Sequence, residues 1–277
     1  MANILINRDK CIGCGQCQRD CLCDTIYMDE GKARVGTKRC IKCGHCIAIC
    51  PKEAITLGNI ENINWDQNNP GMERGRAPEP EAFLDFLKFR RSIRHYKNQD
   101  IEAEKLDMII EAGRYAPTAS NGQKNSFIIL RKNIGQVRKA AVKTLYDAAA
   151  NKERPLGERE MYRQSWVTMY DDLERGKGDR LFFDAPAVIL IVTDKETGSS
   201  DIDAGIAASR MELQANALGL GVCYIGFLST AIEFDDDVRK QIGIGDDERM
   251  AVAFTVGYPD VKYFRPVPRK PADVRIM

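Results

Sequence analysis

Eight of the ten cysteines form two copies of one spacing, and no other feature constrains the fold as much. Both copies follow the pattern C-x2-C-x2-C-x3-C, and they begin 29 residues apart, at Cys11 and Cys40. Nine cysteines lie in the first 50 residues, and Cys223 is the remaining one. A disulfide framework for the whole chain would not be distributed so unevenly. The spacing predicts a small, internally duplicated metal-binding unit at the N-terminus.

The chemistry of the repeat favours iron–sulfur clusters. A cubane cluster needs four thiolates at tetrahedral corners, and a tight C-x2-C-x2-C loop can supply three of them. Gly13, Gly15 and Gly44 suit such a loop, because glycine lets the backbone wrap closely and bring N–H groups to the sulfurs. Zinc is the alternative, since paired C-x2-C units also bind zinc, although zinc sites seldom use this doubled order.

Residues 1–57 resemble the bacterial-type ferredoxin module with two [4Fe–4S] clusters. In such ferredoxins the fourth ligand of each cluster comes from the other motif. The resemblance therefore implies two crossed ligand sets. One set is Cys11, Cys14, Cys17 and Cys50, and the other is Cys40, Cys43, Cys46 and Cys21.

Two positions depart from this module. Leu22 stands where a proline usually follows the fourth cysteine, and Cys23 is an additional thiol two residues after Cys21. We interpret Cys23 as a small buried residue. The alternative is a substitute ligand or a redox-sensitive thiol.

Charge and hydropathy exclude several classes of protein. Lys plus Arg is 41 and Asp plus Glu is 40, so the net charge of +1 argues against a nucleic-acid binder that depends on a basic field. No secretory signal is visible.

The run 213–232 has 20 residues without a charge, but its polar residues and three glycines favour a helix ending at Gly219 and then a buried strand. We expect a cytoplasmic protein without a membrane span.

The remaining chain predicts a linker over 58–81 and a second domain over 82–277. The linker is rich in Asn, Gly and Pro, and the apolar period becomes helical from residue 82. A second helix, with Asp100 as its N-cap, should end before Pro117. Strands are predicted over 127–131, 187–193, 222–227 and 250–258. Helices alternate with these strands, which indicates a mixed layered fold.

Two short segments of this domain carry ligand-binding residue types. Three arginines and Ser92 within RRSIRHY would suit a phosphate, but cations are also favoured at an ordinary helix C-terminus. In the loop 117–123, Asn121 and Gln123 offer the amide donors and acceptors that a flavin edge requires, although a plain turn explains the loop more simply when it is taken alone.

Five segments, in the order in which they occur, resemble the FMN-dependent nitroreductase family over residues 82–271. They are RRSIRHY, APTASNGQ, DAPAVILIV, ALGLGVCYIGF and FTVGYP. The resemblance implies an α+β fold, a mixed sheet flanked by helices, in a domain-swapped homodimer with FMN at its interface. It implies no catalytic side chain, because the flavin does the redox chemistry. The residues matched to FMN binding are Arg90, Arg91, Ser92, Arg94, Thr118, Ala119, Asn121, Gln123, Ile225, Gly226 and Arg269.

The charged insert 150–180 contains several aromatic residues and allows two interpretations. The first is a substrate lid with an aromatic wall near the flavin. The second is a surface amphipathic helix whose aromatic side chains pack inward.

The whole chain predicts an iron–sulfur flavoprotein oxidoreductase that passes electrons from clusters to FMN and on to a nitroaromatic or quinone-like acceptor. Reduced ferredoxin, flavodoxin or NAD(P)H would be the donor. In one alternative, FMN oxidises a substrate and the clusters export electrons to a soluble carrier. In another, the chain is an electron carrier or redox sensor with a degenerate flavin pocket.

Overall fold

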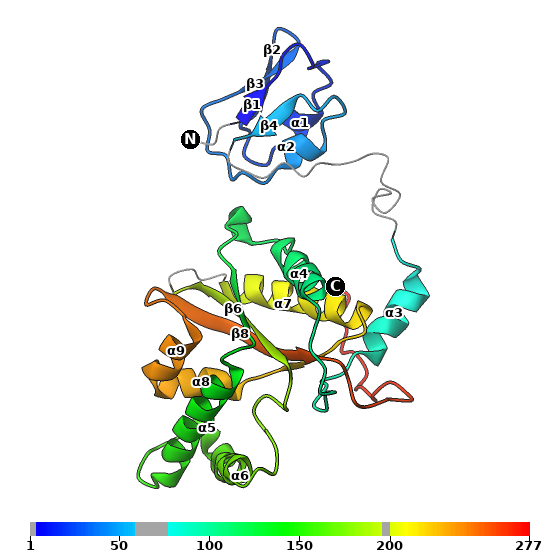
Figure 1. The fold of residues 1–277 in the computed structure, drawn as a ribbon. Helices are drawn as coiled ribbons and strands as arrows, with labels where there is room; N and C mark the ends of the chain where they lie inside the picture. Colours follow the sequence, from blue (N-terminus) through cyan, green and yellow to red (C-terminus); the bar gives the residue numbers. More distant parts are fainter. Residues whose placement is uncertain (1–3, 59–76, 196–199) are drawn as a thin grey trace. The chain divides into compact units, whose positions relative to one another are not determined.

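The computed structural model describes residues 4–58, 77–195 and 200–277 (Figure 1). Contacts divide these residues into two compact units. The first contains the residues up to Ala77 together with Thr118–Gly122, and the second contains Pro78–Pro117 and Gln123–Met277. Most of the predicted linker, residues 59–76, lies outside the described residues. Each unit is described by itself.

The first unit is built from two similar halves. Strand β1 (Ile4–Ile6) pairs antiparallel with β4 (Ile55–Leu57), and β2 (Ile26–Asp29) pairs antiparallel with β3 (Lys32–Val35). Each half also carries one short helix, α1 (Gln16–Arg19) or α2 (His45–Ala48). The two helices start in the same way, because Gly15 (φ 71°) and Gly44 (φ 76°) adopt the left-handed conformation at their N-caps.

The second unit contains a four-stranded antiparallel sheet in the order β5-β6-β8-β7. The strands are β5 (Ser126–Leu130), β6 (Ala187–Asp194), β7 (Gly221–Tyr224) and β8 (Glu248–Gly257). Strand β6 reads as an apolar run because both of its faces are covered. Its side chains alternate: Val188 and Leu190 enter one hydrophobic core, and Ile189 and Ile191 enter the other.

Helices cover both faces of this sheet (Figure 1). Helices α4 (Ala103–Arg114) and α7 (Ser200–Ala217) enclose one core. The other core lies under α5, α6, α8 and α9, whose bounds are Ile134–Ala150, Arg163–Glu174, Phe227–Phe234 and Asp236–Ile242. The remaining elements are α3 (Pro80–Phe89) and two 3-10 turns, η2 (Ala119–Asn121) and η3 (Gly157–Tyr162). The unit is therefore a mixed α+β fold, as predicted.

The predicted strands are present with shifted ends. The largest difference is at 222–227, where β7 ends at Tyr224 because Phe227 already begins α8. The uncharged run 213–232 accordingly divides between α7, β7 and α8. Within the residues that the structure describes, no helix is long and apolar enough to cross a bilayer.

The prediction of Asp100 as a helix N-cap is wrong. Helix α4 begins at Ala103, and Glu102 occupies the N-cap position. The Asp100 carboxylate instead accepts from the N–H of Ile101 and from the guanidinium of Arg131, which precedes α5. A long-range ion pair therefore replaces the local cap that the sequence indicated.

The insert 150–180 packs inward, as the second of its two interpretations requires. Trp166 and Met169 on α6 are buried in the core. Tyr170 stacks on Tyr146 of α5 with ring centroids 4.1 Å apart. Because these side chains join α6 to α5, they are core residues of the unit.

Candidate functional site

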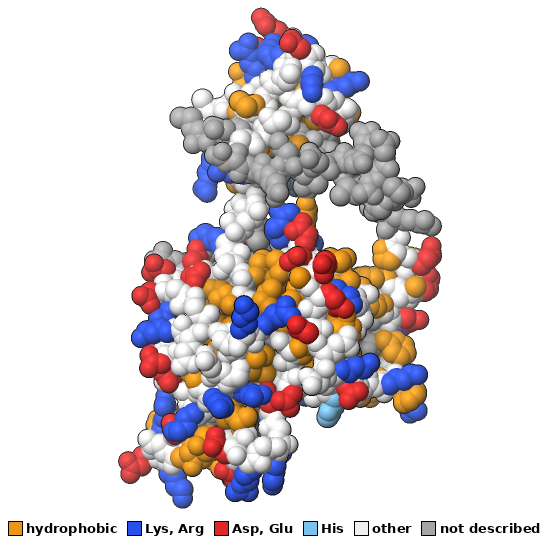
Figure 2. All heavy atoms as spheres, in the orientation of Figure 1, with side chains coloured by type: hydrophobic (Ala, Val, Ile, Leu, Met, Phe, Trp, Pro, Cys, Tyr) orange, Lys and Arg blue, Asp and Glu red, His pale blue; other side chains and the backbone are white. Residues whose placement is uncertain are grey.

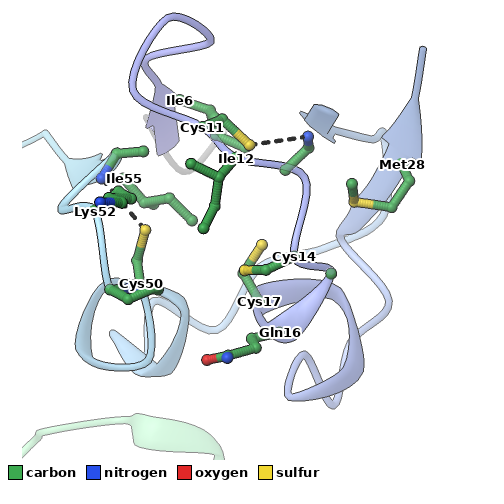
Figure 3. A pocket seen from close by; sticks show the side chains of 14 residues that line it. Ile6, Cys11, Ile12, Cys14, Gln16, Cys17, Met28, Cys50, Lys52 and Ile55 are labelled. Carbon is green, nitrogen blue, oxygen red and sulfur yellow. Dashed lines mark hydrogen bonds between the residues drawn. The ribbon is translucent and has the colours of Figure 1, made fainter. Parts of the chain in front are cut away.

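The first predicted cysteine set surrounds one cavity of the first unit. Figure 3 shows Cys11, Cys14, Cys17 and Cys50 around this space, with apolar side chains such as Ile6 and Ile55 at its wall. Cys50 comes from the second half of the unit and the other three from the first half. The structure therefore brings together the crossed set that the ferredoxin resemblance implies.

The second set surrounds a second cavity. Cys40, Cys43 and Cys46 line it together with Cys21 from the first half of the unit. Cys23 lines the same cavity. All ten cysteines of the chain are free thiols. Two spaces walled by four or more thiols each fit polynuclear iron–sulfur clusters, whose iron atoms are held by thiolates at separated corners.

Backbone N–H groups point at the sulfurs of both sets. The N–H groups of Ala33 and Ala54 donate to Cys11 and Cys50 at 3.5 and 3.3 Å (Figure 3). In the second set, the N–H groups of Thr25 and Lys42 donate to Cys21 and Cys40 at 3.3 and 3.2 Å. Such donors stabilise negative charge on sulfur, and around a cluster they raise its reduction potential.

The same donors act on the thiols themselves. Hydrogen bonds from the backbone of Ala33 and Gly13 lower the pKa of Cys11. For Cys21, burial raises the pKa, but backbone donors led by Thr25 outweigh this, and the net pKa is lowered. Burial raises the pKa of Cys17, and burial with neighbouring thiols raises the pKa of Cys46 to about 11. Loading with metal therefore has to displace protons from the buried thiols.

Gly13 is needed by the first loop for steric reasons. Its φ is +72°, and an added Cβ would lie 2.2 Å from the carbonyl oxygen of Gly31. The loop Cys11–Cys14 thus passes directly over the β2–β3 turn. This close approach also places the N–H of Ala33 next to the Cys11 sulfur.

The second candidate site is the segment 90–96 at the outer edge of strand β7. Ser92 forms a parallel bridge with Val222, and the N–H of Ile93 donates to the Val222 carbonyl at 2.9 Å. Ile93 is buried against Gly221, where an added Cβ would lie 2.4 Å from its side chain. Buried Ile93 therefore anchors the segment. The Arg94 guanidinium lies 5.8 Å from the centre of the Phe183 ring and next to the buried Cys223 thiol.

Arg90 is held by a buried carboxylate. Its Nη1 donates to Oε1 of Glu212 on α7 at 2.8 Å, and the Glu212 side chain is 8% exposed. Tyr224 lies next to this pair; burial, followed by the negative charge of Glu212, raises the pKa of its hydroxyl. Sequence reasoning missed Glu212 and Tyr224. Glu212 could have been noticed because it is an acidic residue among the buried positions of α7, and a buried carboxylate usually has a charged partner.

Residues of the C-terminal segment contact Arg91. Nη2 of Arg91 donates to the carbonyl of Arg265 at 2.7 Å, and its guanidinium lies 5.2 Å from the ring centre of Tyr263. Arg269 lies further along this exposed segment and donates to the carbonyl of Pro268 at 3.5 Å. The structure thus brings residues 263–265 to Arg91.

Ile225 and Gly226 occupy the turn between β7 and α8. Ile225 is buried, and its N–H donates to the Ala253 carbonyl of β8 at 2.9 Å. Gly226 is exposed, and an added Cβ there would meet no atom within 4 Å. Open space beside a backbone fixed to the sheet is a suitable place for a planar ring to lie.

The predicted loop residues lie in and beside the turn η2: Ala119 and Asn121 begin and end it, Thr118 precedes it, and Gln123 follows Gly122. Ser120, Asn121 and Gln123 have positive φ values of 51°, 54° and 48°. Successive left-handed residues other than glycine are uncommon, and they cluster in ligand-binding loops. The loop is therefore built with a strained backbone, which the plain-turn interpretation does not require.

Comparison with known proteins agrees with both units. Residues 87–258 match the nitroreductase family model, and residues 3–51 match the model of the 4Fe-4S dicluster domain. A ferredoxin of Pyrobaculum islandicum is 37% identical over 88 residues, which cover 31% of this chain and 82% of that protein. An iodotyrosine deiodinase of Hydra vulgaris is 24% identical over 183 residues, which cover 62% of this chain and only 63% of that protein.

Further relatives match the second unit. A putative NAD(P)H nitroreductase of Bacillus subtilis is 25% identical over 181 residues, covering 64% of this chain and 84% of that protein. The solved structure of a nitroreductase with bound FMN from Bacteroides fragilis has a TM-score of 0.56 at 21% identity, covering 70% of this chain and 97% of that chain. These matches confirm both resemblances seen in the sequence. The chain belongs to the nitroreductase family and carries an N-terminal 4Fe-4S dicluster domain of the ferredoxin type.

Proposed function

We propose that the protein is an iron–sulfur flavoprotein oxidoreductase in which two [4Fe–4S] clusters deliver electrons to FMN for the reduction of a small aromatic acceptor. The acceptor is a nitroaromatic or quinone-like ring. Reduced ferredoxin, flavodoxin or NAD(P)H supplies the electrons. A reducing cytoplasm is the compartment that this thiol chemistry requires.

The observation that carries the proposal is the pair of thiol-lined cavities on a nitroreductase-family chain. Each cavity is walled by one complete crossed set of four cysteines. Clusters of this kind transfer one electron at a time. A flavin accepts single electrons and can pass on two, so the combination suits the coupling of one-electron donors to a two-electron reduction.

The segment 90–94 is the proposed binding site for the FMN phosphate. Arg91 and Arg94 supply guanidinium groups and Ser92 a hydroxyl at the edge of β7, and guanidinium groups bind phosphate oxygens in pairs. Arg90 faces Glu212, so its charge is already compensated. Its proposed contribution is to hold the start of the segment in place, with Arg269 as a further phosphate ligand from the tail.

The isoalloxazine ring is proposed to lie along Ile225 and Gly226, beside the open space at Gly226. Amide and hydroxyl groups of Thr118, Asn121 and Gln123 would hydrogen-bond its polar edge, with the backbone of Ala119 alongside. FMN, when bound, supplies the hydride and electron chemistry. The side chains supply position and polarity, and none of them acts as a nucleophile.

A homodimer is part of the proposal. Phe83, Leu84 and Leu87 of α3 share one face of the helix by their spacing and are 38–51% exposed, and Phe89 at the end of the helix is 47% exposed. Figure 2 shows hydrophobic side chains at this helix on the surface of the second unit. Phe264, Val274 and Ile276 of the tail are also exposed. Apolar surface of this extent commonly marks an interface, and a second copy of the chain would cover it.

The test is anaerobic purification, followed by analysis of iron, sulfide and FMN and by stopped-flow reduction. We expect about eight irons and one FMN per chain. Mixing with reduced ferredoxin should bleach the cluster absorbance before the flavin absorbance. A chain that holds iron but no FMN after reconstitution would be an electron carrier or redox sensor. Flavin bleaching by NADH or NADPH ahead of the clusters would reverse the proposed order of electron flow.

A further inference from the structure

The second cavity of the first unit is lined by five thiols, one more than a cubane cluster uses. Cys23 lines it beside Cys21, Cys40, Cys43 and Cys46, and it is partly buried. Between the two neighbouring thiols, Leu22 is 89% exposed. Leu22 also borders the cavity, at its exposed rim, so the consecutive residues Cys21, Leu22 and Cys23 all line this space.

The internal repeat shows that this placement is a property of the local turn. Cys50 is the counterpart of Cys21, and Lys52 is the counterpart of Cys23. In both halves a backbone N–H four residues after the cysteine donates to its sulfur at 3.3 Å, from Thr25 in one half and Ala54 in the other.

The intervening residue of each turn also has the same conformation. Asp24 and Glu53 have φ values of 49° and 48°. Each donates its N–H to the carbonyl of the cysteine three residues earlier, Cys21 or Cys50. Lys52 lines the first cavity next to Cys50, as Figure 3 shows. The second position after the fourth cysteine thus faces the cavity in both halves.

The chemistry at this position differs between the halves. A lysine carries an ammonium group at neutral pH, which has no lone pair for iron. A cysteine can lose its proton and bind iron as a thiolate. Of the two cavities, the second therefore has a fifth thiol in its lining, whereas the first has a lysine at the corresponding position.

The geometry points to Cys23 as an alternative ligand for the iron that Cys21 binds. This inference rests on the proposed function, because it presupposes a cluster in the second cavity. In the exchange, the bond from iron to the Cys21 sulfur breaks and a bond from iron to the Cys23 sulfur forms. Cys23 gives up one proton and Cys21 takes one up, and no electron is transferred. The exchange lets the second cluster keep four thiolate ligands when the Cys21 sulfur leaves the iron or is removed by substitution.

The experiment compares matched variants of the full chain, purified anaerobically, by iron content and by the EPR spectrum of the reduced protein. Wild type, Cys21→Ala, Cys23→Ser and the double variant Cys21→Ala/Cys23→Ser form the first group. Cys50→Ala and Cys50→Ala/Lys52→Cys form the control group at the first cavity.

We expect Cys21→Ala to keep the wild-type iron content, with a shifted EPR signal from its new ligand. Cys23→Ser should match wild type in both measurements. The double variant should lose between one and four irons per chain, that is, one corner or a whole cluster. Cys50→Ala should show the same loss, and the added thiol of Cys50→Ala/Lys52→Cys should restore the iron.

Equal iron loss in Cys21→Ala and in the double variant would overturn the inference while leaving the wild-type clusters intact. Loss of the second cluster in Cys23→Ser would overturn it as well, since Cys23 would then be a primary ligand. Failure of the proposed function is distinguishable, because wild type itself would then contain no cluster.

Discussion

Arg90 and Glu212, which are 122 residues apart in the chain, form an ion pair of 2.8 Å inside the second unit. The Arg90 side chain is 28% exposed, whereas the Glu212 side chain is 8% exposed. The pair joins the C-terminus of α3 to the middle of α7. Removing one partner of a buried ion pair leaves an uncompensated charge in the interior, which is strongly destabilising.

Arg90→Met should therefore destabilise the second unit by about 3 kcal/mol, because it leaves the Glu212 charge buried and unpaired. Arg90→Met/Glu212→Leu should be less destabilised than the single variant, since no uncompensated charge remains. Urea unfolding followed by circular dichroism measures both. Lys143→Met is the control, because the pair of Lys143 with Asp147 is more than half exposed and solvent screens it, so its loss should change the stability little. Equal losses in Arg90→Met and Lys143→Met would contradict the prediction.

Gly13→Ala should prevent formation of the first cluster, because its Cβ would overlap the Gly31 carbonyl. Gly15→Ala is the matched control, since its φ of +71° is nearly the same but an added Cβ meets nothing within 4 Å. Both variants carry a left-handed strain of about 1–2 kcal/mol. Iron analysis should show loss from Gly13→Ala and near wild-type content in Gly15→Ala. If both variants retain the same iron content, the close approach at Gly31 is not what limits the loop.

Trp166→Ala should destabilise the second unit by about 3–5 kcal/mol, because it removes a completely buried side chain from the core. Trp166→Phe should cost much less. Among the residues that the structure describes, the buried Trp166 Nε1 has no hydrogen-bond partner, and phenylalanine removes this unsatisfied donor. Met161→Ala, at a position that is 75% exposed, should be close to wild type in the same unfolding measurement. A neutral Trp166→Ala would show that α6 is not part of the core.

Arg91→Ala and Arg94→Ala should each raise the dissociation constant of FMN by about tenfold or more, because each removes a charge-assisted contact to phosphate. FMN fluorescence titration of the deflavinated protein measures this constant. Arg175→Ala is the control, since Arg175 lies on the far end of α6 in an exposed pair with Asp171. Unchanged FMN affinity in both variants would show that the FMN phosphate does not bind at this edge of β7.

Much of the fold could be predicted because its signals are local. Residues 187–193 form an uninterrupted apolar run, and a run of that length suits a strand covered on both faces. The prediction of Asp100 as an N-cap was wrong because capping depends on where the helix begins, and here the Asp100 carboxylate pairs with Arg131 instead. The helical period from residue 82 is confirmed by α3, but the period does not say which surface covers the apolar side chains of this helix.

The sequence by itself determined the doubled cysteine spacing and the order of the nitroreductase segments, and through the resemblance to ferredoxins it predicted the two crossed cysteine sets. Ligand spacing is a property of a few consecutive residues, and the requirements of a cubane cluster restrict it strongly. Only the tertiary structure decided that Glu212 faces Arg90, that Trp166 packs inward, and that Cys23 shares a cavity with four other thiols. These relationships join residues far apart in the chain or depend on the direction of one turn. They arise from packing, which a local pattern does not contain.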